Sequence, residues 1–297
     1  MAICKKNSNF AAVMNTIGQI FRFTDFGESH GVAVGGVLDA VPSQMHIDFE
    51  AIQHDLDRRA GRIGDLTVSE RAKEETDEVE WLSGLLDGVT LGTPIAFIIR
   101  NTNARPEDYE ALKEVYREGH ADKVYEQKYG IRDYRGGGRA SARETVARVV
   151  AGSIAKQILA KDGIRVEGRL VQVGEETDET KFKALLESVR DAGESVGGVV
   201  ECRIKGLPVG VGEPIFDKLQ ARLAYAIMSI NGCRSFEYES GIVGGISDGN
   251  EIVFRCRFKA TATKMKEYGG RHDVCIAVRA VPVVEAMAAL TICDYNR

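Results

Sequence analysis

The sequence predicts an α+β fold with antiparallel β-sheets, and three observations carry this prediction. Strand-like segments come in pairs around short glycine-containing turns, which is typical of antiparallel hairpins. Helical patterns fall between groups of strands and do not follow every strand, which argues against a doubly wound parallel sheet. No GxGxxG dinucleotide motif follows a strand. The chain has 297 residues, which is enough to bury a sizeable core.

The clearest hairpin lies in the first part of the chain. Two apolar segments, 17–26 and 32–41, flank the turn Gly27-Glu28-Ser29-His30-Gly31. Asp48 has the position of an N-cap before an amphipathic helix over 49–59. The elements expected next are a polar loop over 65–78, strands over 79–86 and 94–100, and a short helix over 108–116.

A segment rich in glycine and arginine, Tyr134 to Leu159, organises the middle of the chain. Three glycines at 136–138 stand among arginines, and Ser141 and Glu144 have the spacing of a capping box before an apolar series. Glycines let a ligand approach the backbone, and the start of a helix attracts anions. The segment therefore predicts a phosphate or carboxylate site. The alternative is a surface turn with solvated arginines that caps a core helix.

Small residues follow along this helix, so another helix or a sheet is expected to pack closely against it. They are Ala147, Ala151, Gly152, Ser153 and Ala155. In the second half, strands are expected over 165–174, 197–204 and 251–259, and helices over 178–192 and 216–230. The tail predicts a strand and then a helix from about Val283.

Two histidines stand in polar segments and are candidates for proton transfer. His30 lies in the hairpin turn, and His120 lies in the charged segment Gly119-His120-Ala121-Asp122. Neither has the spacing of a metal ligand, so no metal is expected. The alternative is a turn histidine without a role. His46 and His54 have no such setting and are expected at ordinary surface positions.

Composition excludes several classes of partner. The net charge is −5, so no global basic field is present for nucleic acid or an anionic membrane. No apolar run is expected to reach the ~20 residues of a membrane span. Residues 1–13 look like an extension without the apolar core of a signal peptide. Six scattered cysteines without a CxxC pair predict reduced thiols in a cytoplasmic protein.

Several segments together resemble the chorismate synthase family. They are FGESHG at 26–31, GHAD at 119–122, YEQKYGIRDYRGGGRASARET at 125–145, SINGC at 229–233, GGIS at 244–247 and GRHDVCIAVRAVPVVEAM at 270–287. The resemblance covers nearly all of residues 14–295 in the expected order. It implies a single domain over 14–297 with antiparallel sheets around a central helical layer, usually assembled as a cytoplasmic homotetramer.

The resemblance also implies a reaction. The family converts 5-enolpyruvylshikimate-3-phosphate to chorismate and phosphate by a 1,4-elimination, the last step of the shikimate pathway that feeds aromatic amino acid biosynthesis. The reaction needs reduced FMN although it has no net redox change, and some members reduce the flavin with NADPH. The substrate carries two carboxylates and a phosphate, so several arginines are expected in one pocket.

Roles for individual residues follow from the matching motifs. His30 and His120 resemble the two catalytic histidines, one expected to protonate the reduced flavin and the other the departing phosphate. Asp273 resembles the aspartate that acts with the flavin in deprotonation. The arginines implied for substrate binding are Arg59, Arg62, Arg117, Arg139 and Arg143. The residues implied for FMN binding are Arg139, Ala140, Ser141, Asn231, Gly232, Gly244, Lys259, Ala260, Thr261, Ala262, Thr263 and Arg271.

The sequence departs from the family pattern in two places where a segment is missing. One falls between Tyr238 and Gly241 and the other between Thr263 and Gly269. Either these loops are deleted, or the printed sequence omits mobile loops that the protein carries. We favour the second explanation, which predicts an intact mass well above 32.5 kDa.

Two other functions remain as alternatives on the same anion site. A flavin oxidoreductase would consume NAD(P)H steadily with a separate acceptor, whereas the lyase needs reduced flavin only catalytically. A non-catalytic phosphate-binding module would need neither loop histidine, so substitution of His30 or His120 by alanine would leave its ligand affinity nearly intact.

Overall fold

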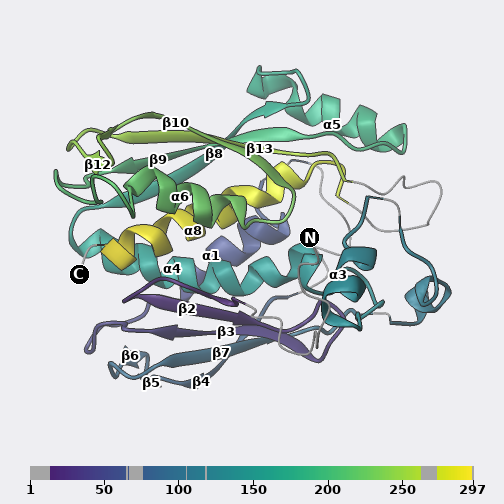
Figure 1. Ribbon diagram of the computed structural model, residues 1–297, viewed down its shortest axis with the longest axis horizontal. Coiled ribbons are helices and arrows are strands. Elements are labelled where there is room, and N and C mark those ends of the chain that lie inside the picture. Colours follow the sequence, from purple (N-terminus) through teal and green to yellow (C-terminus); the bar gives the residue numbers. More distant parts are fainter. Residues whose placement is uncertain are drawn as a thin grey trace, which may run out of the picture.

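The structure is a computed structural model, and it describes residues 14–64, 66, 76–104, 106–117, 119–261 and 273–295. These residues form three layers, with helices between a five-stranded and a four-stranded sheet (Figure 1). Both sheets are antiparallel. The arrangement confirms the predicted α+β fold and the layered sandwich. The expected extension over 1–13 lies outside the described residues.

The five-stranded sheet has the order β1-β2-β3-β7-β4. Its strands are β1 (Thr16–Ile17), β2 (Arg22–Phe26), β3 (Ala33–Asp39), β7 (Ile95–Arg100) and β4 (Val79–Ser83). The predicted hairpin is confirmed, because β2 pairs with β3 and Phe26 lies opposite Gly35. A Cβ on Gly35 would lie 2.4 Å from the carbonyl oxygen of Phe97, so only glycine fits there. A small hairpin, β5 (Leu85–Leu86) and β6 (Val89–Thr90), lies beside this sheet.

The four-stranded sheet has the order β10-β13-β9-β8. Its strands are β10 (Cys233–Ser240), β13 (Ile252–Phe258), β9 (Gly198–Lys205) and β8 (Arg165–Val173). The alternation expected over 251–259 is confirmed, since Ile252, Phe254, Cys256 and Phe258 are buried in the core. β10 was not predicted. It continues through Gly241 into the short hairpin of β11 (Ile242–Val243) and β12 (Ile246–Ser247).

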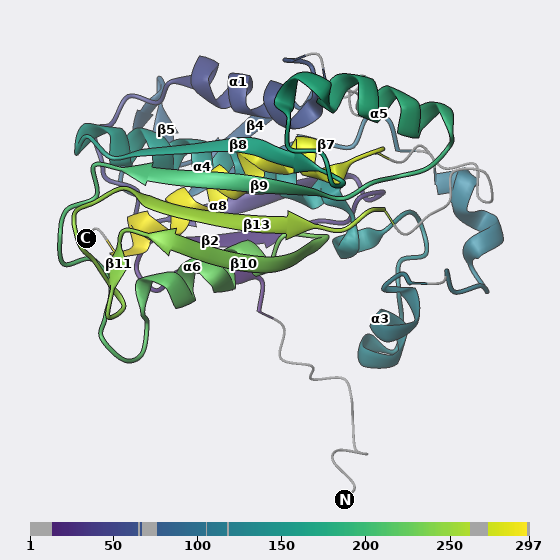
Figure 2. The same cartoon turned by 90° about the horizontal axis from the view of Figure 1, so that it is seen from above.

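Four helices fill the space between the sheets (Figures 1 and 2). They are α1 (Phe49–Ala60), α4 (Thr145–Lys161), α6 (Leu219–Met228) and α8 (Ile276–Tyr295). α1 starts as predicted, because the side chain of Asp48 accepts a hydrogen bond from the Ala51 N–H, and it ends at Gly61, whose φ is 68°.

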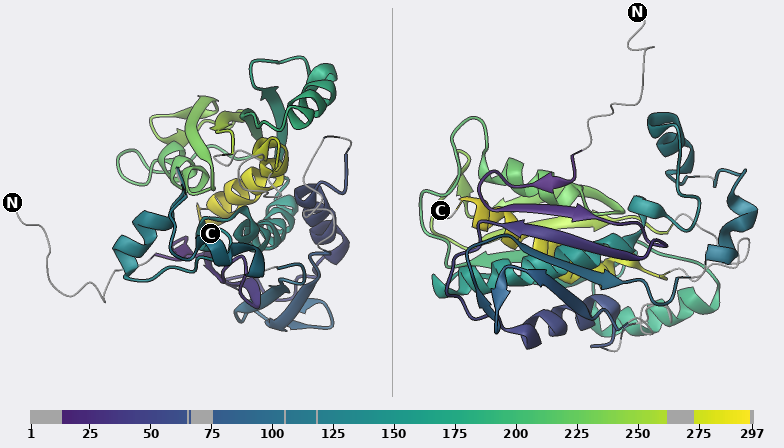
Figure 3. Two further views of the ribbon diagram at one scale, coloured as in Figure 1. Left: turned by 90° about the vertical axis from the view of Figure 1, so that its right-hand side faces the viewer. Right: turned by 90° about the horizontal axis from the view of Figure 1, so that it is seen from below.

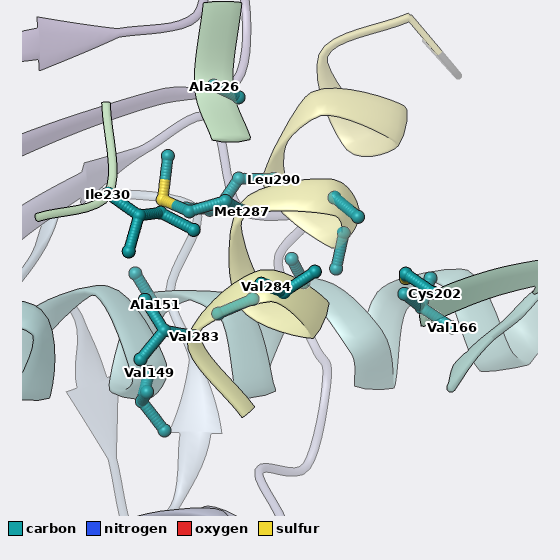
Figure 4. Packing of buried hydrophobic residues seen from close by; sticks show 14 of the residues in the cluster. Val149, Ala151, Val166, Cys202, Ala226, Ile230, Val283, Val284, Met287 and Leu290 are labelled. Carbon is teal, nitrogen blue, oxygen red and sulfur yellow. The ribbon is translucent and has the colours of Figure 1, made fainter. Parts of the chain in front are cut away.

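The closest contact in the helical layer joins α4 to α8. A Cβ on Gly152 would lie 2.2 Å from the Cβ of Ala286, so the backbones approach where a side chain would not fit. This confirms that the small residues of α4 allow close packing. α4 also contacts the five-stranded sheet and α8 the four-stranded sheet. Figure 4 shows part of the resulting core, in which Met287 of α8 lies beside Ile230, which follows α6.

The remaining short elements lie at the edges of the sandwich. The 3₁₀ helix η1 (Pro106–Leu112) and α3 (Asp122–Tyr129) stand off from one end (Figure 3). Two further 3₁₀ turns, η2 (Gly138–Ala140) and η3 (Ala142–Glu144), lead into α4. The turn η4 (Glu179–Lys181) and α5 (Phe182–Asp191) follow β8 at the edge of the four-stranded sheet.

Several sequence-based expectations were wrong. The strand expected before Val283 is part of α8, a single helix with Pro282 inside it. Its β-branched residues suggested a strand, but burial between α4 and the four-stranded sheet overrides that preference. The short helix expected over 108–116 is the 3₁₀ helix over 106–112, and no helix was predicted where α3 lies.

α8 also corrects the expectation about apolar runs. It is long and apolar enough to cross a bilayer by length and composition, and 78% of its apolar window is buried inside the protein. It carries Glu285, which forms ion pairs with Arg58 and Lys156. The apolar composition of α8 is therefore that of a helix buried in the protein core.

Candidate active site

A cavity of about 1300 Å³ opens at the end of the sandwich that carries α3. Its wall combines residues 25–28 at the end of β2, much of segment 120–139, Arg148 of α4, and Ser229 and Asn231 after α6. The volume exceeds the ~300–1000 Å³ typical of a pocket for one small ligand. Segments far apart in the chain thus meet around a space that can hold a large ligand or two ligands.

The glycine-rich loop forms part of this wall and at Gly136 leaves no room for a side chain. Gly136 has a φ of 64°, and a Cβ there would lie 2.3 Å from two atoms of the His30 ring. Ser141 caps η3 by accepting a hydrogen bond from the Arg143 N–H, as its cap position predicted. The second hydrogen bond of a capping box would join the Glu144 side chain to the backbone N–H of Ser141. Glu144 pairs with Arg148 instead. The regular helix α4 begins only at Thr145.

His30 lies between the hairpin turn and the glycine-rich loop. It is buried, with 5% of its surface exposed, and its Nδ1 is 3.0 Å from the Ser29 hydroxyl. The ring of Tyr109 stands edge-on to it at a centroid distance of 4.7 Å. These contacts fix the orientation of the imidazole directly behind Gly136.

His120 borders the cavity and lies in a network of charges. Its Nδ1 is 2.9 Å from a carboxylate oxygen of Asp122 and 3.2 Å from Nη2 of Arg117. Since arginine only donates, we assign the Nδ1 proton to the hydrogen bond with Asp122, which leaves Nε2 for proton exchange. Burial lowers the pKa of His120, and the charges of Arg117 and Lys259 lower it further. A bound anion would offset these charges and favour the imidazolium.

Arg117 links the two histidine environments. Its Nη2 donates a hydrogen bond to the carbonyl oxygen of Gly136 at 2.7 Å, the residue that lies against His30. Its Nε and Nη2 also bind the Asp122 carboxylate at 2.9 and 3.0 Å. The expected residues His30, His120 and Arg117 are therefore gathered around Gly136.

Two of the arginines expected to bind substrate, Arg59 and Arg143, are deeply buried and share one carboxylate. Nη1 of Arg59 is 3.3 Å from Asp77, and Nη1 of Arg143 contacts the other oxygen of the same group. Burial raises the pKa of Asp77, but the two arginines outweigh it and hold the pKa below its usual value. Sequence reasoning missed Asp77, because nothing in one sequence pairs the expected loop over 65–78 with these arginines.

The other two expected arginines have different surroundings. Arg62 pairs with Asp57 at 2.6 Å at the end of α1, away from the cavity wall. Arg139 lies on the wall, where its Nη1 donates to Asp25 at 3.0 Å and to the carbonyl oxygen of Gly27 at 3.1 Å. Arg139 thus joins the glycine-rich loop to the end of β2.

Asp273 is held by a residue that sequence reasoning did not single out. Nη1 of Arg279 lies 2.7 Å from the Asp273 carboxylate, and Nε of Arg279 donates to the carbonyl oxygen of Arg59. The Thr261 hydroxyl donates to the carbonyl oxygen of Asp273 at 3.2 Å. The structure thereby brings the expected residues Asp273 and Thr261 together near the end of α1.

The residues expected at the flavin are only partly brought together. Nδ2 of Asn231 donates to the carbonyl oxygen of Ser141 at 2.8 Å, so the segments 139–141 and 231–232 meet. Gly244 lies in the β11–β12 hairpin, at the opposite end of the sandwich from α3 (Figures 1 and 2). Ala262, Thr263 and Arg271 lie outside the described residues.

Comparisons with known proteins agree on one family. A family model described as chorismate synthase matches residues 21–242 and 238–296. The chorismate synthase of Christiangramia forsetii is 42% identical over 345 residues, covering 95% of this chain and 97% of that protein. The chorismate synthase of Azobacteroides pseudotrichonymphae is 42% identical over 352 residues, covering 95% of this chain and 99% of that protein.

A solved structure described as "Crystal Structure of Chorismate Synthase" has a TM-score of 0.73 and 26% sequence identity, and covers 94% of this chain and 92% of that chain. The alignments with the two relatives are longer than the 297 residues of the chain, so those relatives carry internal residues that it lacks. The family match, the two relatives and the shared layered fold agree, and the chain belongs to the chorismate synthase family.

Proposed function

We propose that the protein converts 5-enolpyruvylshikimate-3-phosphate to chorismate and phosphate in the presence of reduced FMN. The observation that carries this proposal is the cavity where His120, Arg139 and the glycine-rich loop meet in a member of the chorismate synthase family. The comparisons do not favour a flavin oxidoreductase or a non-catalytic phosphate-binding module.

The residues around the cavity fit a phosphorylated flavin beside an anionic substrate. The glycine-rich loop presents backbone where a Cβ would collide with His30, and Arg139 and Arg148 add positive charge. We propose contacts with FMN for residues 139–141, 231–232, 259–263, Gly244 and Arg271. Reduced FMN, when bound, would supply the transient electron donation that this redox-neutral elimination uses.

The protein's own residues would hold and move the protons. His30 and His120 divide two tasks, protonation of the reduced flavin and protonation of the departing phosphate. His120 is suited to give up a proton from Nε2, because Asp122 holds its Nδ1 proton. Asp273, oriented by Arg279, is suited to receive the proton removed from carbon.

The arginines would bind the three anionic groups of the substrate. We propose Arg117 and Arg139 as direct contacts, because each lies beside the cavity or beside Gly136. Arg59 and Arg143, which hold Asp77, add positive potential behind the site, and Arg62 extends it at the end of α1. Guanidinium groups suit carboxylates and phosphates because they can bind two oxygens at once.

An anaerobic assay tests this function. The purified protein is mixed with 5-enolpyruvylshikimate-3-phosphate and dithionite-reduced FMN, and chorismate absorbance and phosphate release are followed. We expect equal amounts of chorismate and phosphate with the flavin unchanged at the end. No turnover with reduced flavin present would refute the lyase, and steady NAD(P)H consumption with an added acceptor would favour the oxidoreductase.

Substitution of His120 by alanine is expected to lower kcat by about 10²–10⁴-fold, the usual contribution of a general acid or base. The matched control is His54→Ala, whose exposed side chain lies on α1 away from the cavity and should leave kcat within about twofold. The absorbance spectrum of bound reduced flavin in His30→Ala and His120→Ala tells which histidine protonates it. A His120→Ala protein with full activity would contradict the assignment.

The family relationship also supports a cytoplasmic homotetramer. It further supports NADPH as a reductant of the flavin. Gly244 lies far from the cavity of its own chain, so it would contact flavin only if a second copy supplied it. Light scattering on the purified protein measures the assembly, and a monomer that turns over at full rate would refute this role of Gly244. Intact mass spectrometry tests the loops proposed near 238–241 and 263–269, and a mass near 32.5 kDa would refute them.

A further inference from the structure

Two buried carboxyl groups meet at the cavity wall, which includes Asp25, and the mechanism above uses neither. Asp25 lies near the end of β2 and Glu144 ends η3, and their exposed fractions are 6% and 1%. The two carboxyl groups lie close together, because a single atom, Nε of Arg148, contacts both of them. Oδ2 of Asp25 and Oε1 of Glu144 are both buried and make no hydrogen bond.

Two arginines accompany these carboxyl groups and line the cavity with Asp25. Nε of Arg148 is 3.0 Å from Glu144 and 3.4 Å from Oδ2 of Asp25, and Nη1 of Arg139 is 3.0 Å from Oδ1 of Asp25. If both carboxyl groups were ionised, the cluster of four side chains would be neutral. It would also bury two acceptors side by side with no proton between them, which is unfavourable.

One proton shared by the two groups removes both difficulties. A protonated carboxyl can donate to the other group, so one hydroxyl hydrogen supplies a donor where the two acceptor groups meet. The cluster then carries one net positive charge on the cavity wall. We propose that Asp25 and Glu144 share one proton at neutral pH and that this proton tunes the affinity of the cavity for a phosphorylated ligand.

The surroundings of the pair support this assignment. Burial raises the pKa of Glu144 to about 8; the charge of Arg148 opposes the rise, and Asp25 adds to it. Arg139 from η2 also favours ionisation of Glu144, while the charge of Glu28 in the hairpin turn acts on Arg139. Tyr125 of α3 faces the pair as well, and its pKa is raised by burial and, in part, by the charge of Glu144.

The inference rests on the proposed function only for the identity of the ligand, FMN or the phosphorylated substrate. An anion bound at Arg139 and Arg148 favours the shared proton, and by linkage the proton favours the anion. As the pH rises through the range where the pair loses its proton, the local charge falls from +1 to 0. The affinity for a phosphorylated ligand should therefore decrease.

Titration of FMN into the full-length protein between about pH 7 and about pH 9.5 tests the inference. We expect the affinity of wild-type protein for FMN to fall about tenfold over this range. Riboflavin, which has the same ring system without the phosphate, should show less than about a twofold change. Glu144→Gln fixes the uncharged form, so its affinity for FMN should vary less than about twofold. Asp25→Asn removes the carboxyl group that adds to the rise of the Glu144 pKa, while burial of Glu144 remains, so the fall in affinity should move to lower pH.

Glu201→Gln is the matched control, because it removes a buried carboxyl on the other sheet and should keep the wild-type pH dependence. A flat wild-type profile, or a wild-type slope retained in Glu144→Gln, would overturn the inference. Infrared spectroscopy gives an independent readout, since the carbonyl band of a protonated carboxylic acid should be present in the wild-type protein at neutral pH and disappear in Glu144→Gln. If FMN does not bind at any pH, the proposed function fails, while the infrared band still tests the shared proton.

Discussion

Glu201 on β9 and Glu144 before α4 are both almost fully buried, at 0% and 1% exposed, yet their surroundings differ in charge. Glu201 receives hydrogen bonds from three arginines, Arg169, Arg203 and Arg255. Although burial raises its pKa, the three arginines lower it to about 2. Glu144 has one arginine and a neighbouring carboxyl, and its pKa is raised to about 8 by burial, with a contribution from Asp25.

The difference shows that burial alone does not decide whether a carboxyl group is charged. The three arginines over Glu201 are about half exposed themselves, at 54%, 36% and 47%, so they keep much of their hydration while they cover it. Glu201 joins β8, β9 and β13 as a permanent anion. Glu144 has fewer donors and can take up a proton beside a ligand cavity.

Asp77 extends this comparison to a carboxylate whose arginines are also buried. Asp77→Asn removes the charge between Arg59 and Arg143, whose side chains are 2% and 4% exposed. We expect a loss of about 3 kcal/mol in the free energy of unfolding, measured by denaturant titration at neutral pH, because two buried cations lose their counterion. The control Asp191→Asn changes a side chain that is 70% exposed. A loss below about 0.5 kcal/mol for Asp77→Asn would show that Arg59 and Arg143 need no counterion.

Glu144→Gln tests, through the pH dependence of protein stability, whether the pKa of Glu144 is raised. The pKa of Glu144 is higher in the folded protein than in the unfolded chain, so its stabilising contribution is present below the unfolded pKa of about 4.3 and is lost as pH rises through about 8. We expect the wild-type protein to lose on the order of 2 kcal/mol more than Glu144→Gln between about pH 5 and about pH 9. Parallel stability profiles would contradict the raised pKa.

Glu201→Gln should have the smallest effect and the opposite pH dependence. The folded-state pKa of Glu201 is depressed, so its contribution is present above about pH 4.3 and is lost as pH falls toward about 2. We expect a loss of about 1 kcal/mol at neutral pH, because the three arginines can return to water. Thermal unfolding at neutral and acidic pH checks both points, and a larger loss at acidic pH than at neutral pH would reverse the assignment.

Much of the local structure could be predicted because neighbouring residues encode it. The turn between β2 and β3, the cap at Asp48 and the inward face of β13 each follow from glycine positions, short-range hydrogen bonds or a period of two. α8 could not be predicted in full, because its β-branched start is helical only where α4 and the four-stranded sheet cover it. Its length and burial are tertiary properties.

The candidate site divides in the same way. Motifs in the sequence pointed to His30, His120 and the glycine-rich loop, and the structure gathers all three around Gly136. Nothing in the sequence indicated that Asp77 lies between Arg59 and Arg143 or that Arg279 holds Asp273.

The sequence by itself determined the α+β class, the chemistry available at the site and the family to which the motifs belong. Only the tertiary structure decided which charges face one another, such as Asp25 with Glu144 and Glu201 with its arginines. The physical reason is that electrostatic energy depends on distance and burial in space, whereas Asp25 and Glu144 stand more than a hundred positions apart and Arg255 is 54 positions from Glu201 along the chain.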